Sequence, residues 1–154
     1  EIGFNYRMSN LLASVGIAQL KNLDTFVRAR RRIFKNYYDA LKYIDRLNFM
    51  IEAENNKSNR WLSTFTIEDE KVKPNTKNRD LIISKLKNKN IEARPVWKPM
   101  HMQPVYKGYD YISDNSYDVS KKLFYTGICL PSGSSLTKND QARIINYIQD
   151  ALKE

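Results

Sequence analysis

The chain has 154 residues, of which 42% are hydrophobic and 12% aromatic, a composition typical of one folded domain and unlike that of a disordered segment. No apolar run approaches the roughly 20 residues that span a bilayer, and the first residues lack a secretion-signal pattern, so we expect a cytoplasmic protein without a membrane partner. Cys129 is the single cysteine; an internal disulfide is excluded, and without paired Cys/His spacing we expect no metal.

The formal net charge of +9 leaves two interpretations open. A basic excess can mark a protein that binds nucleic acid or another polyanion, with Lys and Arg gathered on one face. Here the basic residues are scattered, and the one dense group comprises Arg28, Arg30, Arg31 and Arg32. On a helix these four side chains point to different sides, which favours a solvated or interface-lining arrangement over a polyanion site.

A long helix is expected near the start of the chain. No proline interrupts the stretch from Asn10 to about Tyr43, and apolar residues recur there close to the 3.6-residue helical period. Ser9 or Asn10 is expected to be its N-cap. A helix of about 34 residues would be roughly 50 Å long, more than a domain of this size needs, so we expect its apolar face to pack against something else.

The remainder of the chain predicts a small sheet packed with helices. Strands are expected at residues 61–67, 91–96 and 127–131, where aromatic and β-branched residues are frequent or a proline enforces extended backbone. The order of elements is helix, strand, helix, strand, loop, helix, strand, helix. This order indicates an α/β (α+β) domain with a sheet of about three strands.

Three shorter helices complete the prediction. The first is expected to be capped by Asn75 or Thr76. Its buried side should consist of Leu81, Ile82 and Leu86. The second covers residues 117–125, and Gly127 is expected to end it in the left-handed conformation. The last begins at "TKND", residues 137–140, which has the spacing of a capping box in its acidic form.

A proline-rich loop carries the single histidine. Three of the five prolines fall within residues 95–104, and His101 lies there beside Trp97, Lys98 and Arg94. An imidazole, two cations and an indole suit a phosphorylated or hydroxylated ligand, because the nitrogens donate to oxygens while the indole supplies an apolar wall. The alternative is a histidine that only ties down the loop backbone.

A second candidate site precedes the long helix. Asn5 and Arg7 are hydrogen-bond donors placed just before a helix N-terminus, where free backbone N–H groups favour an anion. The alternative is local capping with Tyr6 packed in the core. No hydrolase triad is visible, since the serines of "PSGSSLT" lack the G-x-S-x-G pattern, and neither common phosphate-binding glycine motif occurs.

Three ordered blocks of sequence carry a resemblance to a known family. They are "GFNYRMSNLLASVGIAQLKNLDTFVRARRRI", "EARPVWKPMHMQP" and "LFYTGICLPSGSSLTKNDQARIINYI". Together they resemble the C-terminal part of the DegT/DnrJ/EryC1/StrS aminotransferases, pyridoxal-phosphate enzymes that aminate nucleotide-linked keto-sugars. The form "RPVWKPMHMQP" is similar to the subset that makes 4-amino-6-deoxy sugars on UDP.

The resemblance implies a division of the chain and of the site. Residues 1–45 would form the helix between domains at the dimer interface, and residues 58–154 the small domain of a fold-type I aminotransferase. The large domain, with the lysine that forms the Schiff base to pyridoxal phosphate, would lie upstream. We therefore expect no catalytic residue in this chain, and no activity from it alone.

Individual roles follow from matched positions. Asn5 corresponds to the family's asparagine that reaches the cofactor phosphate of the neighbouring subunit in a homodimer. Arg7, Trp97, Lys98 and His101 are expected near the sugar nucleotide. The substrates implied are a UDP-linked 4-keto-6-deoxy sugar and an amino donor such as glutamate, for glycan or polysaccharide biosynthesis.

Two other classes of function stay open from the residues alone. A basic α/β module could bind nucleic acid through the arginine cluster and exposed tyrosines, although no stacking motif of RRM or OB type is present and we expect no nucleic-acid partner. The chain could also serve purely for dimerisation, since the long helix predicts an exposed apolar face.

Overall fold

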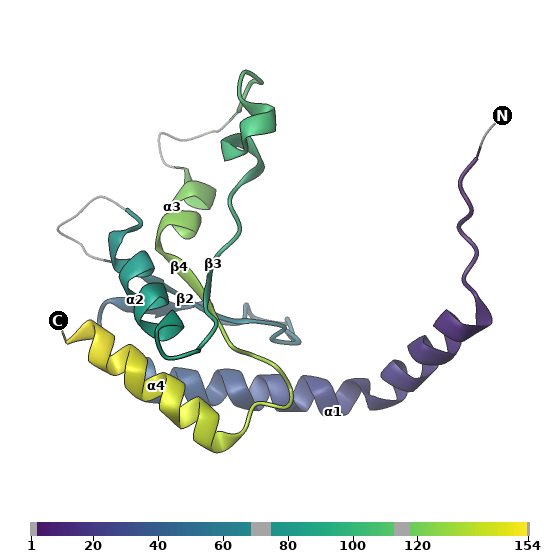
Figure 1. The fold of residues 1–154 in the computed structure, drawn as a ribbon, viewed down its shortest axis with the longest axis horizontal. Coiled ribbons are helices and arrows are strands. Elements are labelled where there is room, and N and C mark those ends of the chain that lie inside the picture. The colour runs from purple at the N-terminus through teal and green to yellow at the C-terminus, as the bar shows by residue number, and fades with distance from the viewer. Residues whose placement is uncertain (1–2, 69–74, 113–117, 154) are drawn as a thin grey trace.

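The computed structural model describes residues 3–68, 75–112 and 118–153 (Figure 1). Within these residues, four α-helices, two short 3-10 helices and four strands follow one another in the order α1 (Asn10–Leu41), β1 (Leu47–Phe49), β2 (Ser63–Ile67), α2 (Lys77–Lys87), β3 (Arg94–Pro95), η1 (Met100–Met102), η2 (Pro104–Tyr106), α3 (Val119–Thr126), β4 (Gly127–Leu130) and α4 (Lys138–Leu152). The strands form one antiparallel sheet in the order β1-β2-β4-β3. The predicted α/β class is confirmed.

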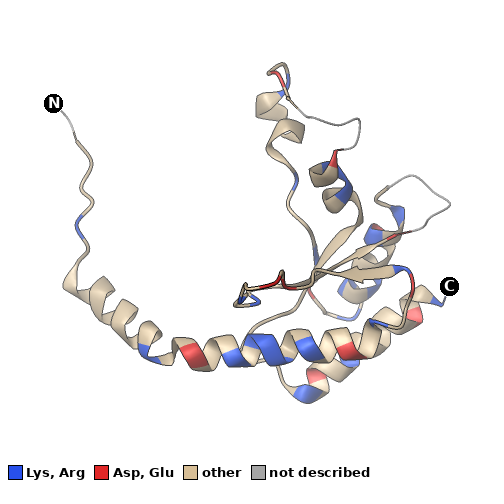
Figure 2. Ribbon diagram, turned by 180° about the vertical axis from the view of Figure 1, so that it is seen from behind, with Lys and Arg blue, Asp and Glu red and all other residues tan. Residues whose placement is uncertain are grey.

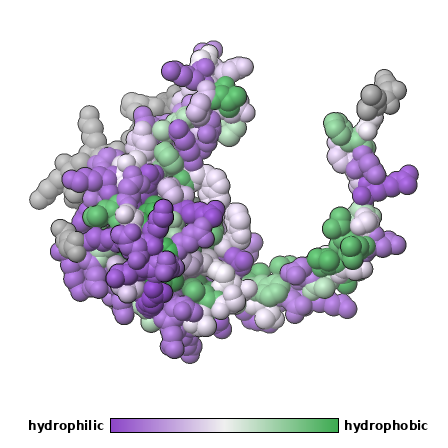
Figure 3. All heavy atoms as spheres, in the orientation of Figure 1, coloured by the Kyte–Doolittle hydropathy of each residue, from purple (hydrophilic) through white to green (hydrophobic). Residues whose placement is uncertain are grey.

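The long N-terminal helix is a single element of 32 residues. The hydroxyl of Ser9 accepts a hydrogen bond from the Leu12 N–H, so Ser9 and not Asn10 is the N-cap. The C-terminal part of α1 is packed into the domain and buries Ile33, Tyr37 and Leu41. The N-terminal part extends beyond the body of the domain, with Leu11 and Leu20 76% and 69% exposed (Figures 1 and 3).

One face of the sheet carries the hydrophobic core. Residues alternate along β2, so that Ser63, Phe65 and Ile67 are buried on this face. Phe65 lies opposite Ile128 of β4, and Ile67 opposite Leu47 of β1, which places these pairs on the same side. The helices that cover them contribute Ile33, Tyr37, Leu41, Ile82, Leu86, Ile144, Ile148 and Ala151.

The opposite face of the sheet is more open and more polar. Thr64 of β2 lies opposite Cys129 of β4, and Cys129 lies opposite Arg94 of β3. Thr66 lies opposite Asn48 of β1 in the same way. The helix α3 lies beside the end of β4 (Figure 1).

Buried polar groups hold α1 to its neighbours. The amide of Gln141 donates to the Ile33 carbonyl at 2.7 Å, and its oxygen accepts from the Asn36 amide at 3.0 Å. The Tyr37 hydroxyl donates to the Pro131 carbonyl at 3.0 Å, and burial raises the pKa of this phenol. These bonds join α1 to α4 and to the turn after β4.

Two element predictions were incomplete. Strand β1 was missed because "LNF" is only three residues long, and its middle residue, Asn48, is polar and exposed. The predicted strand at residues 91–96 shrinks to Arg94–Pro95, since Pro95 has no N–H for a ladder. In α2, Ile82 and Leu86 are buried as expected, but Leu81 is 44% exposed and Arg79 is buried in its place.

The expected capping was partly wrong. Gly127 ends α3 with extended backbone, φ −87° and ψ 138°, so it takes no left-handed conformation. A glycine is needed at this position because a side chain would clash: a Cβ there would lie 2.5 Å from the Leu123 carbonyl oxygen and from a Val96 methyl. α3 starts at Val119 with Asp118 as N-cap, and Tyr117 of the predicted helix lies outside the described residues. The Thr137 cap of α4 is confirmed.

Candidate functional site

Asn5 and Arg7 lie on an extended arm, residues 3–9, that leads into α1 and stands away from the sheet (Figure 1). The Asn5 side-chain oxygen accepts a hydrogen bond from the Arg7 backbone N–H at 3.0 Å. This bond fixes the amide so that its NH2 group is left to donate elsewhere. Tyr6 is 89% exposed, so the part of the alternative that packs it in the core is wrong, whereas the local bond of Asn5 is present.

The arm has the donor groups that a phosphate requires. The Asn5 amide and the Arg7 guanidinium are both exposed, and the residues that the structure describes offer no side-chain partner to that guanidinium. Amide and guanidinium N–H groups are good donors to phosphate oxygens. The arm therefore carries two exposed side chains whose N–H groups are of the kind that bind phosphate oxygens.

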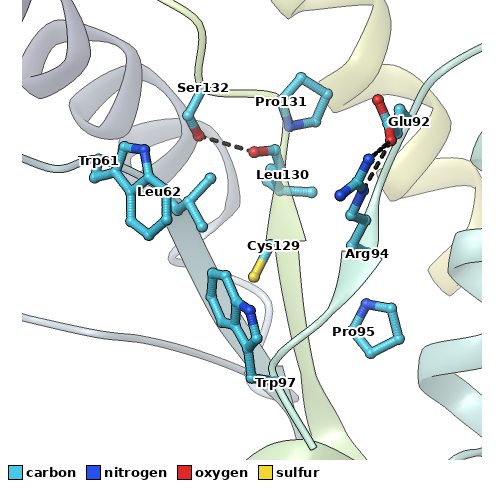
Figure 4. A pocket seen from close by; sticks show the side chains of 10 residues that line it. All are labelled: Trp61, Leu62, Glu92, Arg94, Pro95, Trp97, Cys129, Leu130, Pro131 and Ser132. Carbon is cyan, nitrogen blue, oxygen red and sulfur yellow. Dashed lines mark hydrogen bonds and ion pairs between the residues drawn. The ribbon is translucent and has the colours of Figure 1, made fainter. Parts of the chain in front are cut away.

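Trp97 stacks on Trp61, a residue that the sequence interpretation did not select. The ring centroids are 5.8 Å apart with an interplanar angle of 25°, and the residues are 64% and 60% exposed. Figure 4 shows both indoles beside Cys129 on the open face of the sheet. Trp61 belongs to a predicted strand, and its partner is 36 positions away in sequence, so only tertiary structure reveals the pair.

The two tryptophans border two cavities. The larger, of about 480 Å³, extends over β2 and is lined by the indoles together with Phe49, Met50, Leu62 and the neutral polar residues Asn48, Asn59 and Thr64. The smaller, of about 300 Å³, contains Arg94, Glu92, Cys129 and Ser132 (Figure 4). Glu92 accepts two hydrogen bonds from Arg94 there, and burial raises the pKa of the Cys129 thiol.

His101 lies beside Tyr111 and Asp118. Its ring stacks on Tyr111 with centroids 3.8 Å apart, and its Nε2 lies 2.8 Å from Oδ2 of Asp118. Among the described residues this buried nitrogen has no partner that meets hydrogen-bond geometry, and the Asp118 carboxylate is the acidic group beside it. These contacts favour the interpretation in which His101 ties the loop down, here to α3.

Lys98 and His101 are thus not arranged as one cluster with Trp97. The Lys98 side chain is exposed, and only its carbonyl oxygen has a described contact, from the Gln103 amide at 3.1 Å. Trp97 faces the sheet, whereas His101 faces Tyr111 and Asp118. Within this domain the predicted substrate residues therefore occupy three separate places: the arm, the tryptophan pair, and the loop anchored at α3.

The arginine cluster of α1 is largely occupied by internal contacts. Arg30 donates to the Trp61 carbonyl at 2.5 Å, and Arg31 binds both carboxylate oxygens of Glu52 at 2.8 and 3.0 Å. The Arg31 guanidinium, aided by the Ser58 N–H and Arg60, lowers the pKa of Glu52 to about 2. Figure 2 shows red, acidic positions among the blue, basic positions along the ribbon of α1. Two of the four arginines on which the nucleic-acid alternative relies are therefore already engaged within the chain.

Arg60 is a second residue that the sequence interpretation missed. Its side chain is buried, lies 3.7 Å over the Phe34 ring and donates to the Met50 carbonyl at 2.7 Å. Its φ of 51° is unusual for a residue with a side chain. These contacts hold the segment that carries Trp61 against α1, and Arg60 is therefore engaged before any ligand arrives.

Two features are missing from the part of the chain that the structure describes. No three His, Cys, Asp or Glu side chains gather there as a metal site would need. None of its helices combines the length and the apolar character that crossing a bilayer requires.

Comparisons with known proteins cover almost the whole chain. It is 46% identical over 149 residues to EpsN of Bacillus subtilis (strain 168), a protein provisionally named a pyridoxal phosphate-dependent aminotransferase, covering 96% of this chain and 37% of EpsN. It is 30% identical over 158 residues to the dTDP-4-amino-4,6-dideoxy-D-glucose transaminase of Shigella dysenteriae, covering 99% of this chain and 39% of that protein. The chain thus spans less than two-fifths of the length of these relatives.

A solved structure supports the same relationship. The DegT DnrJ EryC1 StrS aminotransferase of Brucella abortus superposes with a TM-score of 0.80 at 29% sequence identity, over 97% of this chain and 37% of that one. The sequence model of the DegT/DnrJ/EryC1/StrS aminotransferase family matches residues 1–149. The chain therefore belongs to the DegT/DnrJ/EryC1/StrS aminotransferase family.

Proposed function

We propose that this chain is the C-terminal small domain of a pyridoxal phosphate-dependent aminotransferase acting on a nucleotide-linked 4-keto-6-deoxy sugar. The net reaction exchanges two groups: glutamate gives up its amino group and becomes the 2-oxo acid, while the 4-keto carbon of the sugar becomes an amine. The family match over residues 1–149 carries this proposal. The name of the Shigella relative, a 4-amino-4,6-dideoxy-sugar transaminase, supports the position of the amine.

The cofactor would supply the amino-group carrier and the electron sink of this chemistry. From this chain, Asn5 would hold its phosphate through the side-chain NH2 group. The hydrogen bond from the Arg7 N–H to the Asn5 oxygen supports this role, because it orients the amide and leaves its NH2 group available as a donor. The arm stands away from its own sheet (Figure 1), which suits a site completed by another domain or subunit.

The lysine that binds the cofactor covalently would lie outside these 154 residues. The share of the relatives that the chain covers, 37% and 39%, leaves room for a large domain that contains it. We expect the isolated chain to be inactive for this reason. Leu12 and Val15 are exposed on the N-terminal part of α1, where Figure 3 shows hydrophobic surface. This surface would pack in a homodimer interface.

Arg7, Trp97, Lys98 and His101 would act on the substrate side. Trp97 would contact the sugar nucleotide directly, since its indole is exposed at two cavities. Lys98 and Arg7 are exposed cations that would meet phosphate oxygens. His101 would position the loop through Asp118. We propose UDP as the nucleotide on the form of the "RPVWKPMHMQP" segment, and the cytoplasm as the compartment.

A borohydride experiment tests where the lysine lies. The chain is incubated with pyridoxal phosphate, reduced with borohydride and mapped by peptide mass spectrometry. The matched control is a chimera in which this chain replaces the aligned 149-residue segment of EpsN. We expect one stoichiometric label in the chimera, on a lysine contributed by EpsN, and only scattered labelling of the chain alone. A stoichiometric adduct at one lysine of this chain would overturn the proposal.

A further inference from the structure

We propose that Trp61 and Trp97 together form the platform on which the planar base of the nucleotide sugar stacks. The proposal rests on the proposed function for the identity of the ligand. It adds a second residue, Trp61, and assigns one part of the substrate, the base, to one place in the domain.

The geometry is that of a preformed stacking surface. The two indoles are nearly parallel, at 25°, and each is at least 60% exposed. An exposed indole pair leaves a wide apolar face in contact with water, and a base that covers it removes that face from water while gaining ring stacking. A third flat ring can therefore continue the stack without any rearrangement of the pair.

The backbone on both sides of the platform is fixed. The Trp61 N–H donates to the Asn59 side chain at 3.0 Å, and the Trp61 carbonyl accepts from Arg30. On the other side, the Val96 N–H donates to the Gly127 carbonyl at 3.0 Å, directly before Trp97. Two indoles that already stack on each other above a fixed backbone lose little freedom on binding, which is what preorganisation for a ligand requires.

The larger cavity beside the platform suits an uncharged ring. Its volume of about 480 Å³ lies within the range of small-molecule sites. The neutral polar residues in its lining include Asn59, whose side-chain oxygen accepts from the Trp61 N–H and whose NH2 group can donate, and Thr64, whose hydroxyl can donate or accept at the edge of a base. Arg60, the cation in its lining, is already bound to the Met50 carbonyl and the Phe34 ring.

The charged part of the nucleotide belongs elsewhere. In the smaller cavity Arg94 is compensated by Glu92, which accepts from its Nε and Nη2. Neither cavity thus offers a cation unengaged among the described residues that line it. The base is the component of a nucleotide sugar that this surface recognises by stacking and neutral hydrogen bonds, and its phosphates extend beyond it.

The chain provides its own reporter, because Trp61 and Trp97 are its two tryptophans. Indole fluorescence of the full chain is titrated with UMP, dTMP and GMP, and with ribose 5-phosphate as a probe that lacks a base. We expect saturable quenching by the nucleotides and none by ribose 5-phosphate. Equal responses to ribose 5-phosphate and UMP, or no response to any nucleotide, would overturn the platform.

Three variants test whether nucleotide binding depends on the two tryptophans. Trp61→Ala and Trp97→Ala each keep one indole as reporter and should weaken nucleotide binding about 5- to 150-fold, the range for loss of one aromatic stacking partner. Tyr43→Ala removes an aromatic ring that is 78% exposed but lines neither cavity, and it should bind as the parent does. Far-ultraviolet circular dichroism confirms that each variant is folded. Unchanged affinity in both folded tryptophan variants contradicts the proposal.

The EpsN chimera separates this proposal from the proposed function. If the chimera transfers amino groups and Trp61→Ala raises the KM for the nucleotide sugar with kcat retained, both proposals are supported. If the chimera is active and neither tryptophan variant changes KM, the platform is refuted while the function stands. If nucleotides bind the parent chain and not its tryptophan variants, yet the chimera transfers nothing to keto-sugars, the platform stands and the function falls.

Discussion

The imidazole of His101 and the carboxylate of Asp118 are joined across the loop between β3 and α3, with Nε2 and Oδ2 2.8 Å apart. The other oxygen of Asp118 caps α3 by accepting the Lys121 N–H at 2.9 Å. This backbone bond is the largest cause of the lowered pKa of Asp118, followed by the Ser120 hydroxyl and then His101. One carboxylate therefore starts a helix and anchors a loop.

This double role predicts a local effect of His101→Ala. The loop should lose its anchor while the cap of α3 remains, so amide hydrogen exchange should quicken several-fold in residues 100–106 and stay unchanged in α3. Val105→Ala is the matched control, because Val105 is 73% exposed on the same loop. Equal exchange in His101→Ala and the parent would show that the pair does not hold the loop.

Glu52 predicts a loss of stability in acid. Its pKa is lowered from 4.5 to about 2, first by the Arg31 side chain and then by the Ser58 N–H. A carboxyl with a depressed folded-state pKa stabilises the fold above its unfolded value, and this contribution disappears as the pH falls through the folded value. The free energy of unfolding should therefore decline between about pH 4.5 and pH 2.

The matched variant is Glu52→Gln, which keeps the size of the side chain. Urea unfolding at a series of pH values should show a shallower decline for this variant than for the parent. Parallel curves for the two proteins would mean that Glu52 is not responsible for the acid sensitivity.

Two glycines predict opposite responses to alanine. Gly127→Ala should destabilise the fold by about 1–3 kcal/mol, because the added methyl meets Leu123 and Val96 at 2.5 Å. Gly16→Ala should stabilise it by up to about 1 kcal/mol, since Gly16 lies inside α1 with no neighbour within 4 Å of an added Cβ. Thermal and urea unfolding measure both, and a tolerated Gly127→Ala would refute the close approach.

Two buried serines should respond differently to replacement by alanine. The Ser132 hydroxyl accepts from the Ser63 N–H and donates to the Leu130 carbonyl, both at 2.8 Å, so Ser132→Ala should cost about 1–3 kcal/mol. The Ser63 hydroxyl is buried and has no partner among the described residues. Ser63→Ala should therefore leave the free energy of unfolding unchanged or raise it. Equal losses in the two variants would argue against this assignment.

Capping residues and the period of apolar residues predicted where helices lie, because both act between residues close in sequence. The Ser9 and Thr137 caps and the apolar period of α1 are examples, because each acts within a few residues. Trp61 and Arg60 escaped notice because their partners, Trp97, Phe34 and Met50, are brought to them by the fold. The sequence analysis explained Gly127 by a left-handed backbone conformation. The actual reason, crowding by Val96, is a tertiary contact that the sequence does not reveal.

The central claim is that this chain supplies the small domain of a nucleotide-sugar aminotransferase. The most direct measurement is the formation of 2-oxoglutarate from glutamate by the EpsN chimera, given pyridoxal phosphate and a UDP-linked 4-keto-6-deoxy sugar under conditions in which EpsN itself is active. We predict one 2-oxoglutarate for each amino sugar formed, and strongly reduced turnover in Asn5→Ala. A folded chimera that binds the cofactor but forms no 2-oxoglutarate would contradict the account.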